Sequence, residues 1–262
     1  MPTLLNASTT IAPTLQAAYN EQYSEQMTEW RDLSGKEKAN NILEVCEGRT
    51  FSNVLECGAG EGGILKWLDA SHAFGALSAI DVSDSAIEMI KRRDIPSLVD
   101  VKKFDGYTIP YADKAFDLVY CSHVIEHVEH PRLLMREIKR VSGFQVFEVP
   151  LDYSIGCDQN VAHFLSYGHI NVYTPALFKF LLKSEGYTIH RELLSQSGED
   201  VVRYNLYKNQ GRRKTALTEL KVMARAPLKS LRGRIKGKRW NDEYGYNAFT
   251  CLVEATGELK IF

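Results

Sequence analysis

The stretch VLECGAGEGG, from Val54 to Gly63, decides the fold of this chain. Its apolar first half predicts a buried strand that ends at Cys57, and the glycines that follow predict a tight turn. Glycine adopts positive φ without steric cost and lets a ligand approach the backbone closely. Apolar residues with helical spacing follow from Ile64. The stretch is therefore typical of a strand–turn–helix unit in a doubly wound α/β sheet, where ligands bind at the carboxyl ends of strands.

Apolar runs and helical patterns alternate along most of the chain beyond this unit. Repeated units of this kind predict a parallel sheet with helices on both faces and right-handed crossovers. We therefore expect an α/β fold with a doubly wound, seven-stranded, mainly parallel sheet. The strands are expected at residues 52–57, 77–81, 98–104, 116–121, 144–149, 187–194 and 248–255.

Helices are expected before the first strand. Apolar residues spaced three and four apart predict one helix over residues 15–30. Ser34 is a favourable N-cap for a second, short helix that extends through Cys46. We accordingly divide the chain into an N-terminal helical cap (1–48), a sheet core (49–207), a basic, helical insertion (208–244) and the last strand of the core (245–262).

The composition argues against several classes of protein. No run of 18 apolar residues exists, so no membrane-spanning helix is expected. The N-terminal residues have no basic region ahead of an apolar run, unlike a secretory signal. The five cysteines are odd in number and form no C-x-x-C pair, which favours reduced thiols in the cytoplasm over a disulfide framework or a zinc site.

Positive charge is concentrated in one part of the chain, although the formal net charge is only −1. Residues 208–239 form a basic segment with twelve Lys or Arg and one acid, so its net charge is +11. The rest of the chain has 20 basic and 32 acidic residues. Such asymmetry indicates an anionic partner, although a charge run is often only solvated surface. Six apolar residues are expected to hold the segment against the body as one or two helices: Leu217, Leu220, Val222, Met223, Leu228 and Leu231.

Two kinds of ligand fit the glycine turn. Gly58, Gly60 and Gly63 satisfy the G-x-G-x-x-G pattern of dinucleotide sites, with Asp81 at a suitable distance for a ribose. Glu56, however, lies two residues before the first glycine. Its negative charge disfavours a pyrophosphate and favours a ligand with a positive end, such as the α-ammonium of a methionine moiety.

Four segments resemble the class I S-adenosylmethionine-dependent methyltransferases, specifically the group called type 11. They are VLECGAGEGG (54–63), AIDVSDSAI (79–87), FDGYTIPYADKAFDLVYCSHVIEHVEHP (104–131) and GHINVYTPALFKFLLKSEGY (168–187), in the family's order and spacing. The resemblance implies a Rossmann-like methyltransferase fold with S-adenosylmethionine as cofactor and S-adenosylhomocysteine as product. Glu56 is a mild departure, since the family more often has Asp at that position.

The resemblance also implies a cofactor site. In the family, the acid before the turn and the turn glycines hold the methionine end, and the acid after the second strand accepts hydrogen bonds from both ribose hydroxyls. The corresponding residues are Glu56, Gly58, Gly60, Gly62, Asp81 and Val82. The alternatives are a plain strand–helix turn at the glycines and a simple helix N-terminal carboxylate at Asp81.

The rest of the cofactor site is implied at three further places. Asp105, with Gly106 beside it, would bind the adenine amino group, and Ser122 and His123 would line the sulfonium region. An N-terminal helix often covers the cofactor in the family, so Tyr23 is a candidate contact. The alternatives are a turn residue at Asp105 and a packing residue at Tyr23.

Methyl transfer is an in-line displacement on a sulfonium carbon, and orientation contributes roughly 7–11 kcal/mol to such a step. An alcohol acceptor also benefits from a base, and histidine has a suitable pKa. His169 is the first candidate base, with His163 and His123 as alternatives, while His127 is expected to be structural. We assign no metal ligand from the sequence. Because some sugar methyltransferases use magnesium, one set could nevertheless form a site: Asp152, Asp158, His163 and His169.

The expected reaction is O-methylation of a small-molecule or glycan acceptor, and the basic segment indicates that this acceptor is anionic or phosphorylated. Candidate acceptor-binding residues are Tyr173, Arg232, Arg234 and Arg239. The chain lacks the Asn/Asp-Pro-Pro-Tyr motif of amide-nitrogen enzymes and the Pro-Cys of cytosine C5 enzymes. The open alternatives are methylation of RNA, lipid or protein, a cofactor-binding module without methyl transfer, and an NAD-dependent oxidoreductase. The sequence identifies neither the methylated atom nor the oligomeric state.

Overall fold

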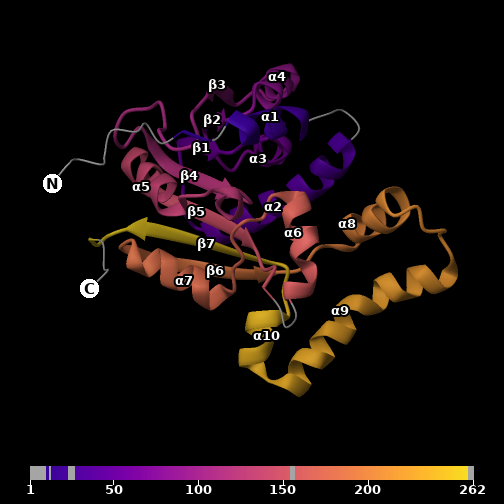
Figure 1. Cartoon of the computed structure of the whole chain (residues 1–262). Helices are drawn as coiled ribbons and strands as arrows, with labels where there is room; N and C mark the ends of the chain where they lie inside the picture. The colour runs from indigo at the N-terminus through magenta and orange to yellow at the C-terminus, as the bar shows by residue number, and fades with distance from the viewer. Residues whose placement is uncertain (1–9, 12, 23–26, 154–156, 259–262) are drawn as a thin grey trace.

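The computed structural model describes residues 10–258 except 12, 23–26 and 154–156, and Figure 1 gives its arrangement. Seven strands form one sheet in the order β3-β2-β1-β4-β5-β7-β6. Strand β7 runs antiparallel to both of its neighbours, and the other pairs are parallel. The strands are β1 (Asn53–Cys57), β2 (Ala76–Asp81), β3 (Leu98–Lys103), β4 (Phe116–Ser122), β5 (Ser142–Pro150), β6 (Tyr187–Ser195) and β7 (Ala248–Ala255). The expected seven-stranded, mainly parallel sheet is confirmed.

Each face of the sheet has its own apolar core, because alternate strand residues point to opposite faces. Val54 of β1 and Leu118 of β4 lie in the core beneath α2 (Thr28–Cys46) and α3 (Gly63–Ser71). Leu55 and Val119, the next residues of the same strands, lie in the core beneath α5 (Pro131–Val141) and α7 (Pro175–Ser184). Helix α4 (Asp84–Arg92) follows β2. Because helices cover both faces of the sheet, a ligand can reach the strands only at their ends.

The N-terminal helices differ from the expectation. Helix α1 spans Pro13–Gln22, and α2 begins at Thr28 rather than Ser34, so Trp30 belongs to the second helix and not to the first. Ser34 is therefore inside α2 and does not cap it. The reason is packing: α2 buries Gly35, Ala39 and Ile42 at helical spacing, and the preceding residues extend this helix outward by more than one turn.

Short elements connect β4 to β6 around the strand ends. A 3-10 turn, η2 (Ile125–His127), follows β4, and η3 (Cys157–Asn160) with α6 (Val161–Tyr167) follows β5. The main-chain N–H groups of Ile170 and Asn171 donate to the carbonyl of Glu126 at 3.0 and 2.9 Å. The loop after α6 is thereby tied to η2, although the two lie far apart in the sequence.

The basic segment is helical, as expected, and lies between β6 and β7. Helix α8 (Glu199–Tyr204) and a π-helical turn (Asn205–Asn209) lead into α9 (Ala216–Lys236), which is followed by α10 (Lys238–Tyr244). Helix α9 contacts α8 and α10 and extends along the side of the molecule, away from the sheet (Figure 1). Among the residues that the model describes, no helix is long and apolar enough to span a membrane.

The expected anchoring of this segment by its apolar residues is wrong. Only Val222 is buried, at 4 % exposure, whereas five others are 53–61 % exposed: Leu217, Leu220, Met223, Leu228 and Leu231. Because α9 rests on other helices rather than on the sheet, most of its apolar side chains have no surface to pack against.

Candidate cofactor and acceptor site

The glycine turn and the end of β2 are joined by hydrogen bonds. The main-chain N–H of Gly60 donates to Oδ2 of Asp81 at 2.7 Å, and that of Ser83 donates to Oδ1 at 2.8 Å. The carboxylate is only 3 % exposed. Asp81 therefore lies beside the turn at the carboxyl edge of the sheet, as the proposed ribose contact requires.

The turn also requires glycine where it meets the end of β4. Gly58 has a φ of 79°, and a Cβ atom there would lie 2.4 Å from Cγ2 of Val124. Gly62 likewise has a positive φ of 82°, and a Cβ there would lie 3.3 Å from side-chain atoms of Ile90 and Arg93. The close approach puts the glycine turn directly against the residues that follow β4.

Glu56 and Asp81 are buried acids in this turn. The Tyr120 hydroxyl donates to Oε2 of Glu56 at 2.8 Å. Burial raises the pKa of Glu56 to about 8, although the hydrogen bond from Tyr120 and the charge of Lys38 oppose this. Burial also raises the pKa of Asp81 to about 6, against the backbone hydrogen bonds from Ser83 and Gly60. Within the described residues neither acid forms an ion pair, so the two desolvated acids favour a positively charged ligand.

A third acid of the turn, Glu61, was not predicted and anchors the turn to its surroundings. It is 2 % exposed and pairs with Arg31 of α2 at 2.9 Å and with Arg93, just after α4, at 3.0 Å. Arg93 also contacts Asp32 at 2.9 Å. A buried carboxylate held by two guanidinium groups fixes the turn geometrically. The sequence offered no signal for this role beyond an acid among glycines.

The expected adenine position is covered by the N-terminal segment. The N–H of Ile11 donates to the carbonyl of Asp105 at 3.3 Å, and a Cβ on Gly106 would lie 2.5 Å from Cγ2 of Ile11. The side chain of Gln16 donates to the carbonyl of Val82. Asp105 itself uses Oδ1 to accept the N–H groups of the two residues after Gly106, as a turn residue does. An adenine at this position would therefore share it with the segment that leads into α1.

Helix α1 continues across the ribose side of the site. The carbonyl of Tyr19 accepts the Ser83 hydroxyl at 3.3 Å, and the side chain of Asn20 accepts the N–H of Asp84 at 2.9 Å. The Tyr19 ring meets the His127 ring edge to face with centroids 6.5 Å apart. Tyr19 thus lies where a cap residue was expected, whereas Tyr23 lies outside the described residues.

Ser122, the last residue of β4, and His123, which follows it, each meet a different buried acid. The Ser122 hydroxyl donates to Glu148 of β5 at 2.7 Å, and Glu148 also accepts from Asn41 of α2 at 2.8 Å. His123 has a φ of 55°, a conformation that is costly for a residue other than glycine. Its Nδ1 lies 3.4 Å from Oε1 of Glu126. Ser122 is therefore oriented by a buried acid that was not predicted, and the ring of His123 lies near Glu126.

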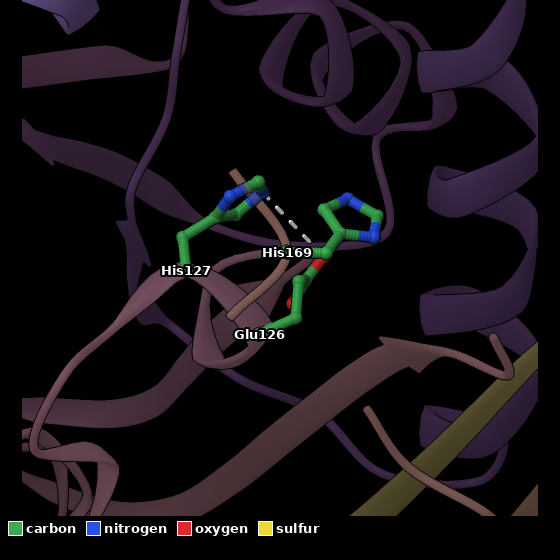
Figure 2. A group of neighbouring side chains, drawn as sticks. All are labelled: Glu126, His127 and His169. Atoms are coloured by element: carbon green, nitrogen blue, oxygen red, sulfur yellow. Dashed lines mark ion pairs between the residues drawn. The ribbon is translucent and has the colours of Figure 1, made fainter. Parts of the chain in front are cut away.

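His169 lies in the loop after α6 and is hydrogen-bonded through Nδ1 to Oδ2 of Asp152 at 2.5 Å. Burial lowers its pKa, but the hydrogen bond that it donates to Asp152 and the charge of Glu126 outweigh this, so the pKa lies above its ordinary value. The His127 ring meets the His169 ring with centroids 4.8 Å apart. Figure 2 shows the side chains of Glu126, His127 and His169 close together.

The magnesium set considered from the sequence is only partly assembled. Asp152 and His169 meet, but Asp158 is exposed on η3, and the side chain of His163, on α6, lies outside the described residues. One potential ligand atom each from Glu126, His127 and His169 lies within 4.8 Å of the other two. The H-x-x-E-H spacing after β4 was the available signal for the first two, but the contact with His169 depends on the loop.

The candidate acceptor residues are separated in space. Tyr173 is 8 % exposed, packs against Phe178 and belongs to the core under α7. Burial, followed by the charge of Glu126, raises its pKa to about 12. Arg232, Arg234 and Arg239 are exposed on α9 and α10, and the Arg232 guanidinium lies over the Trp240 ring. Tyr173 is therefore a core residue, and the arginines lie on the surface of the basic segment, so the structure does not bring these four residues together.

Comparisons with known proteins agree with this geometry. Residues 55–143 match a family model described as "Methyltransferase domain". The protein named "Putative methyltransferase YrhH" of Bacillus subtilis (strain 168) is 32 % identical over 119 residues. That alignment covers 43 % of this chain and 66 % of the relative, which is just under two thirds of its length.

Solved structures share the fold. The geranyl diphosphate C-methyltransferase of Streptomyces coelicolor A3(2), solved with Mg²⁺, geranyl diphosphate and S-adenosylhomocysteine, is 13 % identical with a TM-score of 0.58. The match covers 94 % of this chain and 90 % of that chain. A SAM-dependent methyltransferase of Archaeoglobus fulgidus is 18 % identical with a TM-score of 0.57, over 87 % of this chain and 97 % of that chain. The chain therefore contains a methyltransferase domain of the type 11 group, with the Rossmann-like fold of the class I S-adenosylmethionine-dependent methyltransferases.

Proposed function

We propose that the chain transfers the methyl group of S-adenosylmethionine to an oxygen of a small-molecule or glycan acceptor. The observation that carries this proposal is the contact between the glycine turn and Asp81, at 2.7 Å from Gly60, beside the buried Glu56. These acids suit the ribose hydroxyls and the α-ammonium of the cofactor. A pyrophosphate in the same turn would gain nothing from a protonated Glu56 and would be repelled by its ionised form, so the NAD alternative is disfavoured.

The acceptor side is at Asp152 and His169. In the reaction, the acceptor oxygen forms a bond to the methyl carbon while the carbon–sulfur bond breaks and leaves a neutral thioether. The acceptor proton must be lost, and an imidazole whose Nδ1 is held by a carboxylate presents Nε2 for that purpose. His169 therefore acts on the acceptor hydroxyl, either as the base itself or through a bound cation.

Incubation of the full chain with labelled S-adenosylmethionine and fractionated acceptor pools tests this function. Mass spectrometry should find a product with one added CH₂ that carries the label. S-adenosylhomocysteine should also bind and raise the unfolding temperature by linkage. Absence of cofactor binding would refute the proposal. Binding without any labelled product across the acceptor pools would favour a module without methyl transfer.

We infer that the acceptor is anionic. Lys229 of α9 donates to the side chain of Asn247 at 3.3 Å, and the Asn247 carbonyl accepts the N–H of Leu151 at 2.9 Å. Leu151 precedes Asp152, so the basic segment is attached to the loop that holds His169. Phosphate or carboxylate groups of an acceptor could therefore contact this segment.

The cysteines Cys46, Cys57, Cys121, Cys157 and Cys251 are free thiols, which supports a reducing compartment such as the cytoplasm.

A second candidate is methylation of a lipid-linked acceptor at an anionic membrane surface. The observation that favours it is the exposed apolar stripe of α9, extended to Ile235 at 75 % exposure, among lysines and arginines. Such a helix can lie in the headgroup region of a bilayer. Flotation with vesicles of phosphatidylglycerol should then capture the wild type but not the variant Leu217→Ser, Leu220→Ser, Leu228→Ser. Equal flotation of both proteins would remove this candidate.

A further inference from the structure

The residues after β4 and the loop after α6 enclose a cluster of one carboxylate and two imidazoles (Figure 2). Glu126 and His127 come from η2, and His169 comes from the loop tied to η2 by the main-chain bonds of Ile170 and Asn171. The amide side chain of Asn171 also donates to the carbonyl of Val128 at 2.8 Å. The cluster is therefore held by a rigid frame rather than by a loose loop.

Glu126 has unusual surroundings for a carboxylate. Its exposure is 0 %, and within the described part of the chain neither Oε1 nor Oε2 has a hydrogen-bond partner of good geometry. Imidazole nitrogens of His123 and His127 lie within ion-pair distance, at 3.4 and 3.8 Å from Oε1. Buried charged groups are normally paired, hydrogen-bonded or bound to a metal, because desolvation is otherwise costly. The carboxylate thus faces a place that suits a cation.

Both imidazoles are oriented as metal ligands usually are. His127 Nδ1 lies 3.0 Å from the carbonyl of Gly168, which can only accept, so Nδ1 carries the proton. His169 Nδ1 lies 2.5 Å from Oδ2 of Asp152, so the same tautomer is expected there. In each ring the lone pair is then on Nε2. A carbonyl or carboxylate on the far nitrogen is the typical outer contact of a metal-bound histidine.

We propose that Glu126, His127 and His169 form a binding site for a divalent transition-metal ion. Two imidazoles with one carboxylate favour ions such as Zn²⁺, Co²⁺ or Mn²⁺ over Mg²⁺, which prefers oxygen ligands. Ligand atoms of a bound ion lie about 3–3.5 Å apart, since each is about 2.0–2.2 Å from the metal. One potential ligand atom of each residue now lies within 4.8 Å of the others, so the three side chains must move closer together to bind an ion.

Three protein ligands leave coordination positions open for water or substrate. The cluster lies next to the expected ribose position, and Tyr19 links the two. Its ring contacts the ring of His127, and its carbonyl accepts the hydroxyl of Ser83, two residues after Asp81. A hydroxyl of the acceptor bound to the ion would have a lowered pKa and would release its proton to solvent before it attacks the methyl carbon. This part of the inference rests on the proposed function, whereas metal binding itself does not.

Metal binding is tested with the full chain after treatment with a chelator and removal of the chelator. Titration with Co²⁺, followed by its visible absorption, and competition with Zn²⁺ should show one tight site per chain. The variants His169→Ala and His127→Asn should each raise the Kd by about 10²-fold or more, since each loses a direct ligand. His127→Asn can keep a donor for the carbonyl of Gly168, which guards against simple misfolding. The control His130→Asn changes a nearby histidine outside the cluster and should leave the Kd unchanged.

Failure of the metal site and failure of the proposed function give different results. No stoichiometric metal binding by a wild type that binds S-adenosylhomocysteine would overturn the metal site alone, as would unchanged affinity in both variants. Metal binding without cofactor binding would uphold the site and refute the methyltransferase activity. Where both hold, the chelator should abolish turnover, added Co²⁺ or Mn²⁺ should restore it, and the affinity for S-adenosylhomocysteine should not change.

Discussion

The carboxyl edge of the sheet and the basic segment use charge in opposite ways. At the edge, Asp81 is 3 % exposed and Glu56 is 1 % exposed, and each accepts a hydrogen bond from a neighbouring residue of the fold. On α9 and α10 the charges of Arg234 and Arg239 are exposed. Buried charges are costly and persist only where they are paired or bind a ligand, whereas solvated charges are weakly constrained. We therefore expect the carboxyl edge to bind a specific ligand, and we expect the basic segment to make weaker contacts that depend on salt.

The largest effect is expected from the histidine at the acceptor side. His169→Ala should lower turnover by about 10²–10⁴-fold, because the acceptor proton is lost at this position. The affinity for S-adenosylhomocysteine should remain nearly unchanged, since the side chain faces the acceptor. Steady-state kinetics with the identified acceptor and calorimetry with the product measure the two quantities. Full turnover in a folded His169→Ala protein would move the role to His163 or His123.

The next effect is expected at the ribose acid. Asp81→Ala should weaken S-adenosylhomocysteine binding by about 1.5–3 kcal/mol, the range for hydrogen bonds to a charged group. Asp81→Asn keeps an acceptor for only one of the N–H groups of Gly60 and Ser83, because they donate to different oxygens, so the unfolding temperature of both variants is measured beside ligand binding. Asp84→Ala, at an exposed position of α4, is the matched control. An affinity equal to that of the wild type in both Asp81 variants would exclude this residue from the site.

A moderate, pH-dependent effect is expected at Glu56, whose pKa is raised to about 8 by burial. The carboxyl must lose its proton to face the ammonium of the ligand, so binding releases a proton and the affinity should rise with pH. Between pH 6 and pH 7.5 the ligand ammonium stays charged, and the Kd should fall by up to about 10-fold per pH unit. Titration calorimetry in buffers of different ionisation enthalpy measures both quantities. Glu56→Gln should bind more weakly and lose this slope, and a slope preserved in that variant would assign it to another group.

The smallest effect is expected on the basic segment. The triple change Arg232→Gln, Arg234→Gln, Arg239→Gln should raise the acceptor KM by a few fold and reduce its salt dependence, because exposed pairs contribute about 0–1 kcal/mol each. Cofactor affinity should not change. The double change Lys91→Gln, Arg92→Gln, at the end of α4, is the control for net charge. Kinetics that ignore both salt and the triple change would leave the segment as solvated surface, whereas a salt slope on long RNA alone would favour a nucleic-acid acceptor.

The cluster of Glu126, His127 and His169 and the N-terminal segment show where sequence patterns stop being informative. His127 was interpreted as structural because its neighbours predict only a helical turn, yet its Nδ1 meets Gly168 and its ring meets His169. Ile11 lies before the first helix predicted from the sequence, yet it packs against Gly106. Both contacts join residues that are distant in the sequence, and no local pattern encodes such a distance.

The seven strands and their order along the chain, the glycine turn, and the positions of Glu56 and Asp81 at strand ends could be predicted from the sequence alone. These features depend on local backbone preference and on hydrophobic period, which short stretches of sequence contain. Only the tertiary structure decided that His169 meets Asp152 and Glu126, that Glu61 pairs with Arg31 and Arg93, and that the apolar side chains of α9 stay exposed. Those contacts depend on how loops and helices pack across the sheet, because burial and distance are properties of the assembled chain.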